Sequence, residues 1–224
     1  MKGNNHLSIF NNNSKLKKYY KKPTRRSRQT NKLNNRTLNM RKFKKIVGGN
    51  NGDKLNNDNS HIIKFNNGLY IGKIDENGMP HGQGTVDYSN GNHYEGNWLN
   101  GQINGKGKME FKDGRIYDGN WNNGEIDGKG KMTYIDNCIY DGEWIKGRKN
   151  GKGIMYYPNN TIFEGEWSDG KKNGQGKMYY ANNTLYEGNW INDSKQDNGK
   201  YHELDDNGNI INSHDINPNK KAKY

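Results

Sequence analysis

Residues 94–116 read YEGNWLNGQINGKGKMEFKDGRI, and the motif that opens this stretch returns at a constant interval. Tyr-x-Gly-x-Trp, with Phe once in place of Tyr, occurs four more times at steps of 23 residues, and a divergent copy begins 24 residues earlier at Tyr70. The recurring positions are Tyr94, Gly96, Trp98, Tyr117, Gly119, Trp121, Tyr140, Gly142, Trp144, Phe163, Gly165, Trp167, Tyr186, Gly188 and Trp190. A fixed period of this length indicates a repeat architecture.

Within each unit the side chains alternate with a period of two. Tyr94, Gly96 and Trp98 share one face of an extended strand, whereas Glu95 and Asn97 share the other, which is typical of a half-buried antiparallel strand. Since the glycines of the unit share the parity of its aromatic residues, we expect each indole to lie over a strand that has no side chains there. Stacked units would form ladders of Trp98, Trp121, Trp144 and Trp167 and of Met109, Met132, Met155 and Met178.

The turns between units end in Gly or Asn, which tolerate a positive φ. A three-residue loop of residues 112–114, with Gly114 left-handed, pairs Met109 with Tyr117 and Gly105 with Trp121. A two-residue loop would put Met109 and Tyr117 on opposite faces. We therefore predict the three-residue loop, because a buried face fixes the register of its strands.

The pattern Tyr-x-Gly-x-Trp-x-x-Gly-x-x-x-Gly-x-Gly resembles the MORN repeat (membrane occupation and recognition nexus) over residues 62–204, about two thirds of the chain. The resemblance implies an all-β fold, an elongated, twisted, single-layer antiparallel sheet of stacked hairpins that is similar to a solenoid. It also implies a non-catalytic scaffold or adaptor for an unidentified protein partner, often near membranes, with some members dimerising end to end. A homodimer is thus a further expectation.

Atypical ends suggest caps on the repeat array. Residues 62–69 resemble the second half of a unit and predict the first strand, and residues 199–204 predict the last. A turn near Asn207-Gly208 and a short strand at Ile210-Ile211 would close the edge. We therefore divide the chain into a disordered Asn/Lys-rich arm (1–61), the repeat domain (62–204), and a C-terminal cap with a frayed tail (205–224).

Charge is segregated along the chain. The net charge is +12, yet the first acidic residue is Asp53, and residues 1–52 hold 15 Lys and Arg, so they carry +15 and the remainder carries −3. The arm lacks the apolar core of a secretory signal peptide, and no apolar run of membrane-spanning length occurs in the chain. We expect an intracellular protein, cytoplasmic or membrane-peripheral, with nuclear location as the alternative.

Two stretches of the arm could bind anionic surfaces. The basic cluster at residues 15–28 suits a nuclear-import signal, an anion-binding patch or a solubilising tail. Residues 40–47 have the pattern of a short basic amphipathic membrane helix. The candidate contacts are Lys17, Lys18, Lys21, Lys22, Arg25, Arg26, Arg41, Lys42, Lys44 and Lys45. Peripheral binding of anionic phospholipid is the alternative to the scaffold, and non-specific nucleic-acid contact by the arm is the second alternative.

A further basic group lies in the repeats. Two successive units carry Arg148-Lys149 and Lys171-Lys172 where earlier units have Gln102-Ile103 and Glu125-Ile126. We expect these residues to lie in loops that stack as one basic patch at an edge of the sheet. Contact with acidic lipid headgroups and plain solvation are both open for this patch.

Catalytic chemistry has little support in the sequence. The six His residues are scattered without metal-ligand spacing, and the single Cys, Cys138, sits beside a turn with no base partner in the pattern. The repeated acids Glu95, Asp118, Asp141, Glu164 and Glu187 are interpreted as cross-strand partners of Lys106, Lys129 and Lys152. We predict no catalytic, cofactor-binding or metal site.

Overall fold

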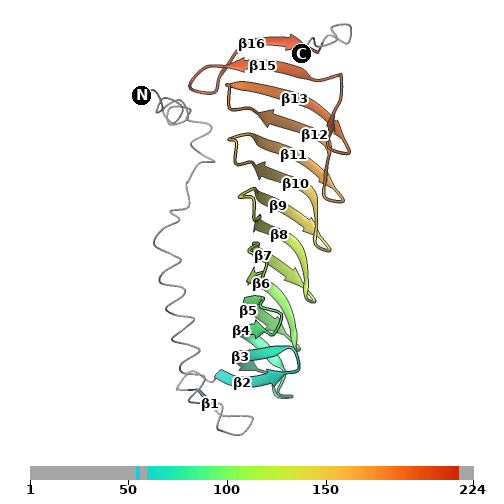
Figure 1. Ribbon diagram of the computed structural model, residues 1–224. Coiled ribbons are helices and arrows are strands. Elements are labelled where there is room, and N and C mark those ends of the chain that lie inside the picture. The colour runs from blue at the N-terminus through green and yellow to red at the C-terminus, as the bar shows by residue number, and fades with distance from the viewer. Residues whose placement is uncertain (1–53, 56–59, 217–224) are drawn as a thin grey trace, which may run out of the picture.

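The computed structural model describes residues 54–55 and 60–216 (Figure 1). These residues form a single 16-stranded antiparallel sheet, and no helix occurs among them. The strands are β1 (Lys54–Leu55), β2 (Ser60–Phe65), β3 (Gly68–Ile74), β4 (Pro80–Tyr88), β5 (His93–Leu99), β6 (Gln102–Glu110), β7 (Ile116–Asn122), β8 (Glu125–Thr133), β9 (Ile139–Ile145), β10 (Arg148–Tyr156), β11 (Ile162–Ser168), β12 (Lys171–Tyr179), β13 (Thr184–Ile191), β14 (Ser194–Lys195), β15 (Lys200–Leu204) and β16 (Ile210–Asp215).

Strand order in the sheet follows chain order from β1 to β16, except that the short β14 pairs with β13 off the main path. Successive hairpins stack along one long axis and the stack twists (Figure 1). This confirms the all-β, single-layer fold predicted from the repeat. The predicted C-terminal strands are confirmed as β15 and β16, whereas the first strand predicted over residues 62–69 was only partly right: β2 ends at Phe65, residues 68–69 begin β3, and the short β1 precedes β2. Residues 15–28 and 40–47 of the basic arm lie outside the described residues, whereas β1 and the start of β2 fall within the range 1–61 assigned to the arm.

Hairpins between repeats use the three-residue loop that the alternation predicts. Met109 pairs with Tyr117, and Gly105 pairs with Trp121. The N–H of Gly114 donates to the carbonyl of Phe111 at 3.0 Å, and Gly114 has φ +95°. A type I turn followed by a left-handed residue is the usual form of this loop. The register therefore puts the aromatic and methionine side chains on one face.

Hairpins within each repeat have a different turn, which the sequence analysis did not identify. Leu99 pairs with Gln102, so the loop contains only Asn100 (φ +48°) and Gly101 (φ +79°). Two successive residues at positive φ define a type I′ turn, whose twist matches that of the flanking strands. The Asn-Gly directly before β6 is a sequence signal for this turn. The same geometry recurs at 123–124, 146–147, 169–170 and 192–193.

A bulge interrupts each repeat where the first glycine of Gly-x-Gly stands. Gly96 pairs with Gly107 but Trp98 pairs with Ile103, so three residues of β6 oppose the single Asn97 of β5. Gly105 within this bulge has φ +81°, a conformation that favours glycine. A Cβ built there would meet the Asn97 side chain at 3.3 Å and not an indole. The first glycine is therefore required by its backbone conformation.

The second glycine makes room for a tyrosine, which corrects the expectation that the indole lies over the glycines. A Cβ on Gly107 would lie 2.1 Å from Tyr94 Oη, and one on Gly96 would lie 2.5 Å from the same atom. The Tyr94 ring thus covers a glycine pair on two adjacent strands. The indole of Trp98 instead donates from Nε1 to the carbonyl of Gly84 at 3.2 Å.

Tyrosines and tryptophans interleave into one continuous chain of rings and not into separate ladders. The Tyr94 ring packs edge-to-face on Trp98 at 5.6 Å and on Trp121 at 5.6 Å. The same contacts continue through Tyr117, Trp144, Tyr140, Trp167, Phe163, Trp190 and Tyr186. Edge-to-face pairs contribute about 0.5–1.5 kcal/mol each beyond their area. The predicted ladder methionines are buried beside this chain of rings.

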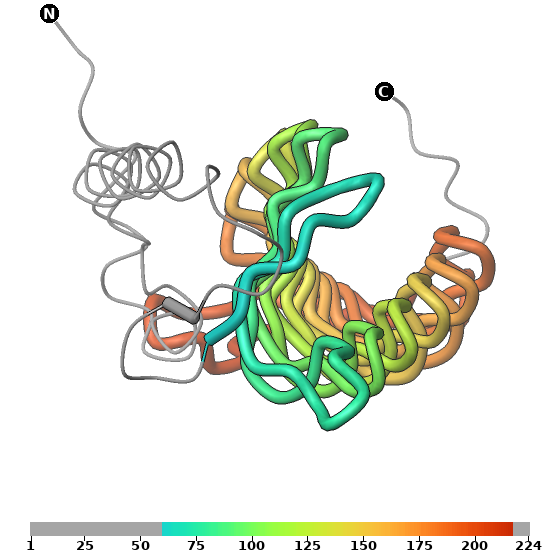
Figure 2. The backbone as a smooth tube through the Cα atoms, turned by 90° about the horizontal axis from the view of Figure 1, so that it is seen from below, coloured from blue at the N-terminus to red at the C-terminus, as the bar shows by residue number. Residues whose placement is uncertain are grey.

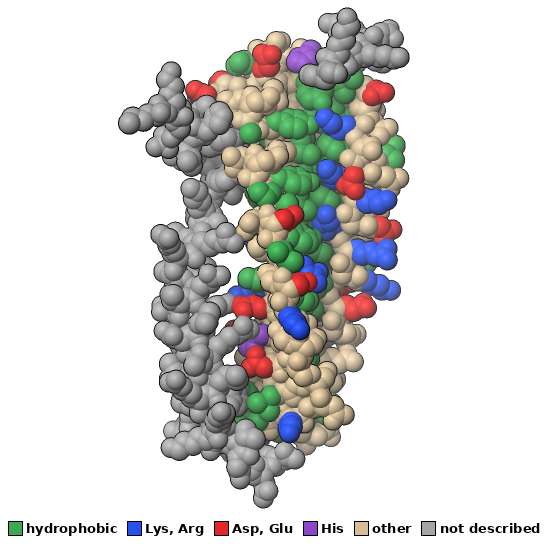
Figure 3. All heavy atoms as spheres, in the orientation of Figure 1, with side chains coloured by type: hydrophobic (Ala, Val, Ile, Leu, Met, Phe, Trp, Pro, Cys, Tyr) green, Lys and Arg blue, Asp and Glu red, His purple; other side chains and the backbone are tan. Residues whose placement is uncertain are grey.

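No second layer covers the aromatic face of the described sheet. The sheet instead curls into a trough, which the view along the long axis shows (Figure 2). Hydrophobic side chains form a stripe along its inner face (Figure 3). Tyr94 and Tyr117 are fully buried and Trp121 is 6% exposed, so the curl and the interleaved rings take the place of a covering layer.

The acid–lysine pairing expected from the sequence was wrong in its partners. Glu95 stands opposite Lys108, and Asp118 stands opposite Lys108 and Lys131. Lys106 lies opposite Asn120. The partner is therefore the lysine two residues later, present as Lys108, Lys131 and Lys177, because the first lysine sits in the bulge; in the remaining unit Ile154 occupies this position. One such pair, Lys177–Glu187, is an ion pair of 3.1 Å on adjacent strands.

Phe163 is the one phenylalanine in the row of ring positions, and it lacks a hydrogen bond that its counterparts make. The Tyr117 hydroxyl donates to the carbonyl of Asn120 at 2.9 Å, and the Tyr140 hydroxyl donates to that of Glu143 at 3.0 Å. We expect Phe163→Tyr to raise the free energy of unfolding by about 1 kcal/mol through the same bond to Glu166. Urea titration of both proteins measures the change. Tyr140→Phe should lose a similar amount, and a destabilised Phe163→Tyr protein would contradict the prediction.

Candidate functional site

The inner face of the trough changes character halfway along the sheet. Each tryptophan faces one residue of the next strand. In the first repeats this residue is an isoleucine: Ile103 opposite Trp98 and Ile126 opposite Trp121. In the later repeats it is Lys149, Lys172 and Lys195, opposite Trp144, Trp167 and Trp190. We call these three the lysine row. Each lysine stands opposite a tryptophan and at the same position of its repeat. The row therefore lies on the aromatic face and follows the long axis of the sheet.

The first two members of the row lie over aromatic rings. Lys149 Nζ is 4.0 Å from the centre of the Trp167 ring, and Lys172 Nζ is 4.7 Å from that of Trp190. Both distances suit cation–π attraction. Burial lowers the pKa of both lysines, with Asp193 acting in the opposite direction. The Asp193 carboxylate accepts the backbone N–H of Lys172 at 2.9 Å.

Lys195 ends the row and is held by phenols. Its Nζ donates to Tyr180 Oη at 2.9 Å and to Tyr201 Oη at 2.7 Å. Burial lowers the pKa of Lys195, but the hydrogen bonds to the two phenols outweigh burial, so the net shift is upward. The ammonium group is therefore a fixed positive charge at this end of the inner face.

A second row of aromatic residues borders the inner face. Its members recur every 23 residues and are half-buried against the core, namely Tyr88, Phe111, Tyr134, Tyr157 and Tyr180. Burial raises the pKa of Tyr157 to about 12, so its hydroxyl is a hydrogen-bond donor at neutral pH. We call these five residues the rim row. It combines apolar ring surface with polar hydroxyls.

The structure separates the four repeat-borne basic residues that the sequence analysis grouped into one loop patch. They are the first two residues of β10 and β12, not loop residues, and a strand directs successive side chains to opposite faces. Arg148 and Lys171 are exposed, and Arg148 Nη1 lies 3.2 Å from Asp169 Oδ1. Lys149 and Lys172 belong to the lysine row.

Sequence reasoning missed Lys195, the third member of the row. Lys195 stands 23 residues after Lys172, so the period alone could have found it. The last unit diverges, with Asp193 in the place of the turn glycine, and this divergence hid the match. The ten candidate contacts of the arm, from Lys17 to Lys45, lie outside the described residues.

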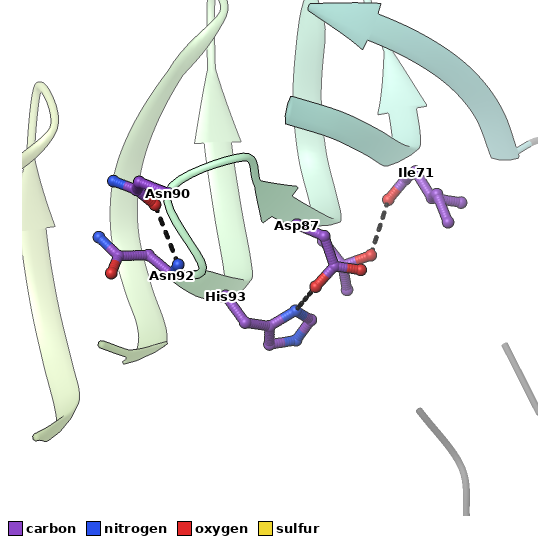
Figure 4. A network of polar contacts seen from close by, with 6 residues as sticks. Ile71, Asp87, Asn90, Asn92 and His93 are labelled. Carbon is purple, nitrogen blue, oxygen red and sulfur yellow. Dashed lines mark hydrogen bonds and ion pairs between the residues drawn. The ribbon is translucent and has the colours of Figure 1, made fainter. Parts of the chain in front are cut away.

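The groups that could carry chemistry are engaged in local contacts. Burial, and next a hydrogen bond with Asp136, raise the pKa of Cys138 to about 11, so the thiol is protonated at neutral pH. His93 Nδ1 lies 2.6 Å from Asp87 Oδ1 (Figure 4). His202 Nδ1 lies 2.8 Å from Ser213 Oγ.

Over residues 54–55 and 60–216, no group of three His, Cys, Asp or Glu side chains is arranged to hold a metal ion. Among the same residues, no helix is long and apolar enough to cross a membrane.

The sequence of the repeats matches one protein family. The family model described as MORN repeat matches five consecutive segments, residues 76–93, 94–114, 117–139, 140–162 and 163–185. No curated protein sequence matches the chain.

Solved structures similar to the chain include the following two domains. One is the SAS-4 (dCPAP) TCP domain of Drosophila melanogaster in complex with a proline-rich motif of Ana2 (dSTIL), at 15% identity and a TM-score of 0.38, covering 67% of this chain and 77% of that one. Another is the wild-type TCP10 domain of Danio rerio CPAP, at 14% identity and a TM-score of 0.37, covering 62% and 69% respectively.

Proposed function

The chain is a MORN-repeat protein, with five consecutive repeats across residues 76–185, and from this we propose that it is a non-catalytic scaffold that binds a partner protein along the inner face of its trough. The observation that carries the proposal is the hydrophobic stripe on that face, most continuous over its C-terminal half, which has no covering layer in the described sheet (Figure 3). Extended concave surfaces are the usual binding surfaces of repeat proteins.

The rim row supplies suitable anchors for a partner. Its rings are half-buried, so each is held in place by the core but keeps surface to offer. Aromatic residues dominate the binding energy of many protein interfaces because they bury large areas with little loss of side-chain freedom. A partner that lies along the trough would meet one ring per repeat. His93 is paired with Asp87 and His202 with Ser213, and the Cys138 thiol is protonated. These local contacts support a non-catalytic role.

Site-specific photo-cross-linking of the full chain tests which face binds. We expect p-benzoylphenylalanine in place of Phe111, on the inner face, to capture a defined protein in cells on irradiation. The same probe in place of Ile145, which is 52% exposed on the outer face, is the matched control and should capture none of that protein. Equal capture at both positions, or capture at Ile145 alone, would refute the inner-face scaffold.

Anionic phospholipid is the second candidate partner, favoured by the outward direction of Arg148 and Lys171 and by the exposed turn residue Lys146. Asp169 lies within ion-pair distance of Arg148 and offsets part of this charge. Flotation of the full chain with phosphatidylserine vesicles tests the candidate. Binding that is lost in a Lys146→Asn, Arg148→Gln, Lys171→Gln variant would support it, and no flotation of the unaltered chain would exclude it.

A further inference from the structure

The lysine row gives the inner face of the trough a regular pattern of charge. Ile103 and Ile126 occupy the same place in the earlier repeats, so the fold itself accepts an aliphatic side chain there. Three consecutive repeats instead have Lys149, Lys172 and Lys195. The fold therefore does not require lysine at these positions.

The ammonium groups of the row face aromatic rings and phenol oxygens. None of the ion pairs found among the described residues involves Lys149, Lys172 or Lys195. The acidic group that acts on the pKa of Lys149 and Lys172 is Asp193, whose carboxylate already accepts a backbone N–H. An amine held over an apolar face with its charge only partly balanced favours an anionic ligand that can reach into the trough.

Spacing along the row specifies the form of such a ligand. Equivalent positions in successive repeats are two strands apart, which is about 9.5 Å along the axis. A polyproline II segment rises about 3.1 Å per residue with three residues per turn, so its side chains return to the same side about every 9.3 Å. A β-strand returns every 6.6 Å or so and does not match. Aromatic grooves are also the usual receptors of polyproline II segments.

We propose that the C-terminal half of the inner face binds a polyproline II segment of a partner protein that carries a carboxylate at every third residue. The carboxylates pair with Lys149, Lys172 and Lys195, and the residues between them lie on the rings of the rim row. Farther along the trough, Ile103 and Ile126 would accept apolar residues at the same interval. This inference rests on the inner-face scaffold proposed above.

Charge and shape exclude two other occupants. Residues 1–52 of this chain hold 15 Lys and Arg and no acidic residue, so the basic arm is repelled by the row. A lipid bilayer presents a flat surface, whereas the row lies on the inner face of a curved sheet (Figure 2). A narrow extended peptide reaches this face without deforming the sheet.

Two peptides of equal composition test the spacing with the full chain. The probe is fluorescein-labelled, capped Glu-Pro-Pro-Glu-Pro-Pro-Glu, whose near-symmetry lets it lie in either chain direction. The control, Glu-Pro-Glu-Pro-Glu-Pro-Pro, has the same charge with the acids at alternate positions. Fluorescence anisotropy in about 0.15 M salt should show at least about tenfold weaker binding of the control.

A matched pair of triple variants tests the residues. Lys149→Ile, Lys172→Ile and Lys195→Ile together copy the earlier repeats and should weaken probe binding about 100-fold, since each exposed ion pair contributes up to about fivefold. Lys146→Asn, Arg148→Gln and Lys171→Gln together remove the same charge from the outer positions and should change binding by less than about threefold.

Several outcomes would overturn the inference: no binding of the probe, equal affinity for the two peptides, or equal losses in the two triple variants. Circular dichroism of both variants shows whether the sheet is intact. Cross-linking at Phe111 reports on the first half of the trough independently of the lysine row. Failure of the peptide experiment with intact cross-linking would therefore reject the acidic segment alone, whereas failure of both would also reject the inner-face scaffold.

Discussion

Gly130→Ala is expected to lower the free energy of unfolding by about 3 kcal/mol or more, although it adds a single methyl group. A Cβ at this position would lie 2.2 Å from Tyr117 Oη and 2.4 Å from its Cζ. The Tyr117 ring cannot move aside, because Trp121 and Trp144 pack edge-to-face against it at 5.2 Å and 5.7 Å. Moving the ring would also break the hydroxyl bond to the Asn120 carbonyl. Urea titration followed by tryptophan fluorescence measures the loss.

Two controls separate the steric cause from backbone effects. Gly124 has φ +83° with no atom within 4 Å of an added Cβ, so Gly124→Ala tests backbone strain alone and should cost about 1–2 kcal/mol. In a Tyr117→Leu protein the clash partner is gone, and the added cost of Gly130→Ala should fall well below its value in the parent chain. Equal costs in the two backgrounds would contradict the ring as the cause.

The glycines show how far the sequence could predict the fold. Period, strand parity and the three-residue loop followed from residue type alone, because an alternation of two with one buried face leaves one register. The roles of Gly105 and Gly107 could not be separated, since a glycine gives no sign of whether it supplies a positive φ or space. The bulge at Gly105 and the Tyr94 ring over Gly107 therefore could not be predicted from the sequence.

The candidate site was predicted only in part for a related reason. Lys149 and Lys172 stood out as departures from the repeat, but their placement in loops hid the alternation that separates them from Arg148 and Lys171. The turn ends two residues earlier than the glycine spacing suggested, because Asn-Gly and its equivalents form a two-residue type I′ loop. Once that turn is recognised, the lysine row, including Lys195, follows from the period.

Trp144→Ala should have the second large effect, and should change the form of the unfolding curve as well as its midpoint. Trp144 is 3% exposed and joins the rings of Tyr117 and Tyr140. Its Nε1 donates to the Gly130 carbonyl at 3.0 Å. Loss of this side chain should cost about 4 kcal/mol. Since each repeat contacts only its neighbours, a gap at the middle also uncouples the two halves of the sheet, and two transitions should replace one.

Hydrogen exchange with mass spectrometry locates the uncoupling. Amides of β7 to β10 should lose protection in the Trp144→Ala protein, while strands toward the two ends keep more of theirs. Ile145→Ala is the matched control, because Ile145 is the next residue, 52% exposed on the opposite face, and its loss should change stability by less than about 0.5 kcal/mol. Trp144→Phe keeps an aromatic ring at this position but loses the hydrogen bond to the Gly130 carbonyl. This protein should unfold in a single transition whose midpoint lies at a lower denaturant concentration than in the parent. If Trp144→Ala also unfolds in one transition with uniform loss of protection, the sheet is cooperative over its whole length and the nearest-neighbour account of its stability is wrong.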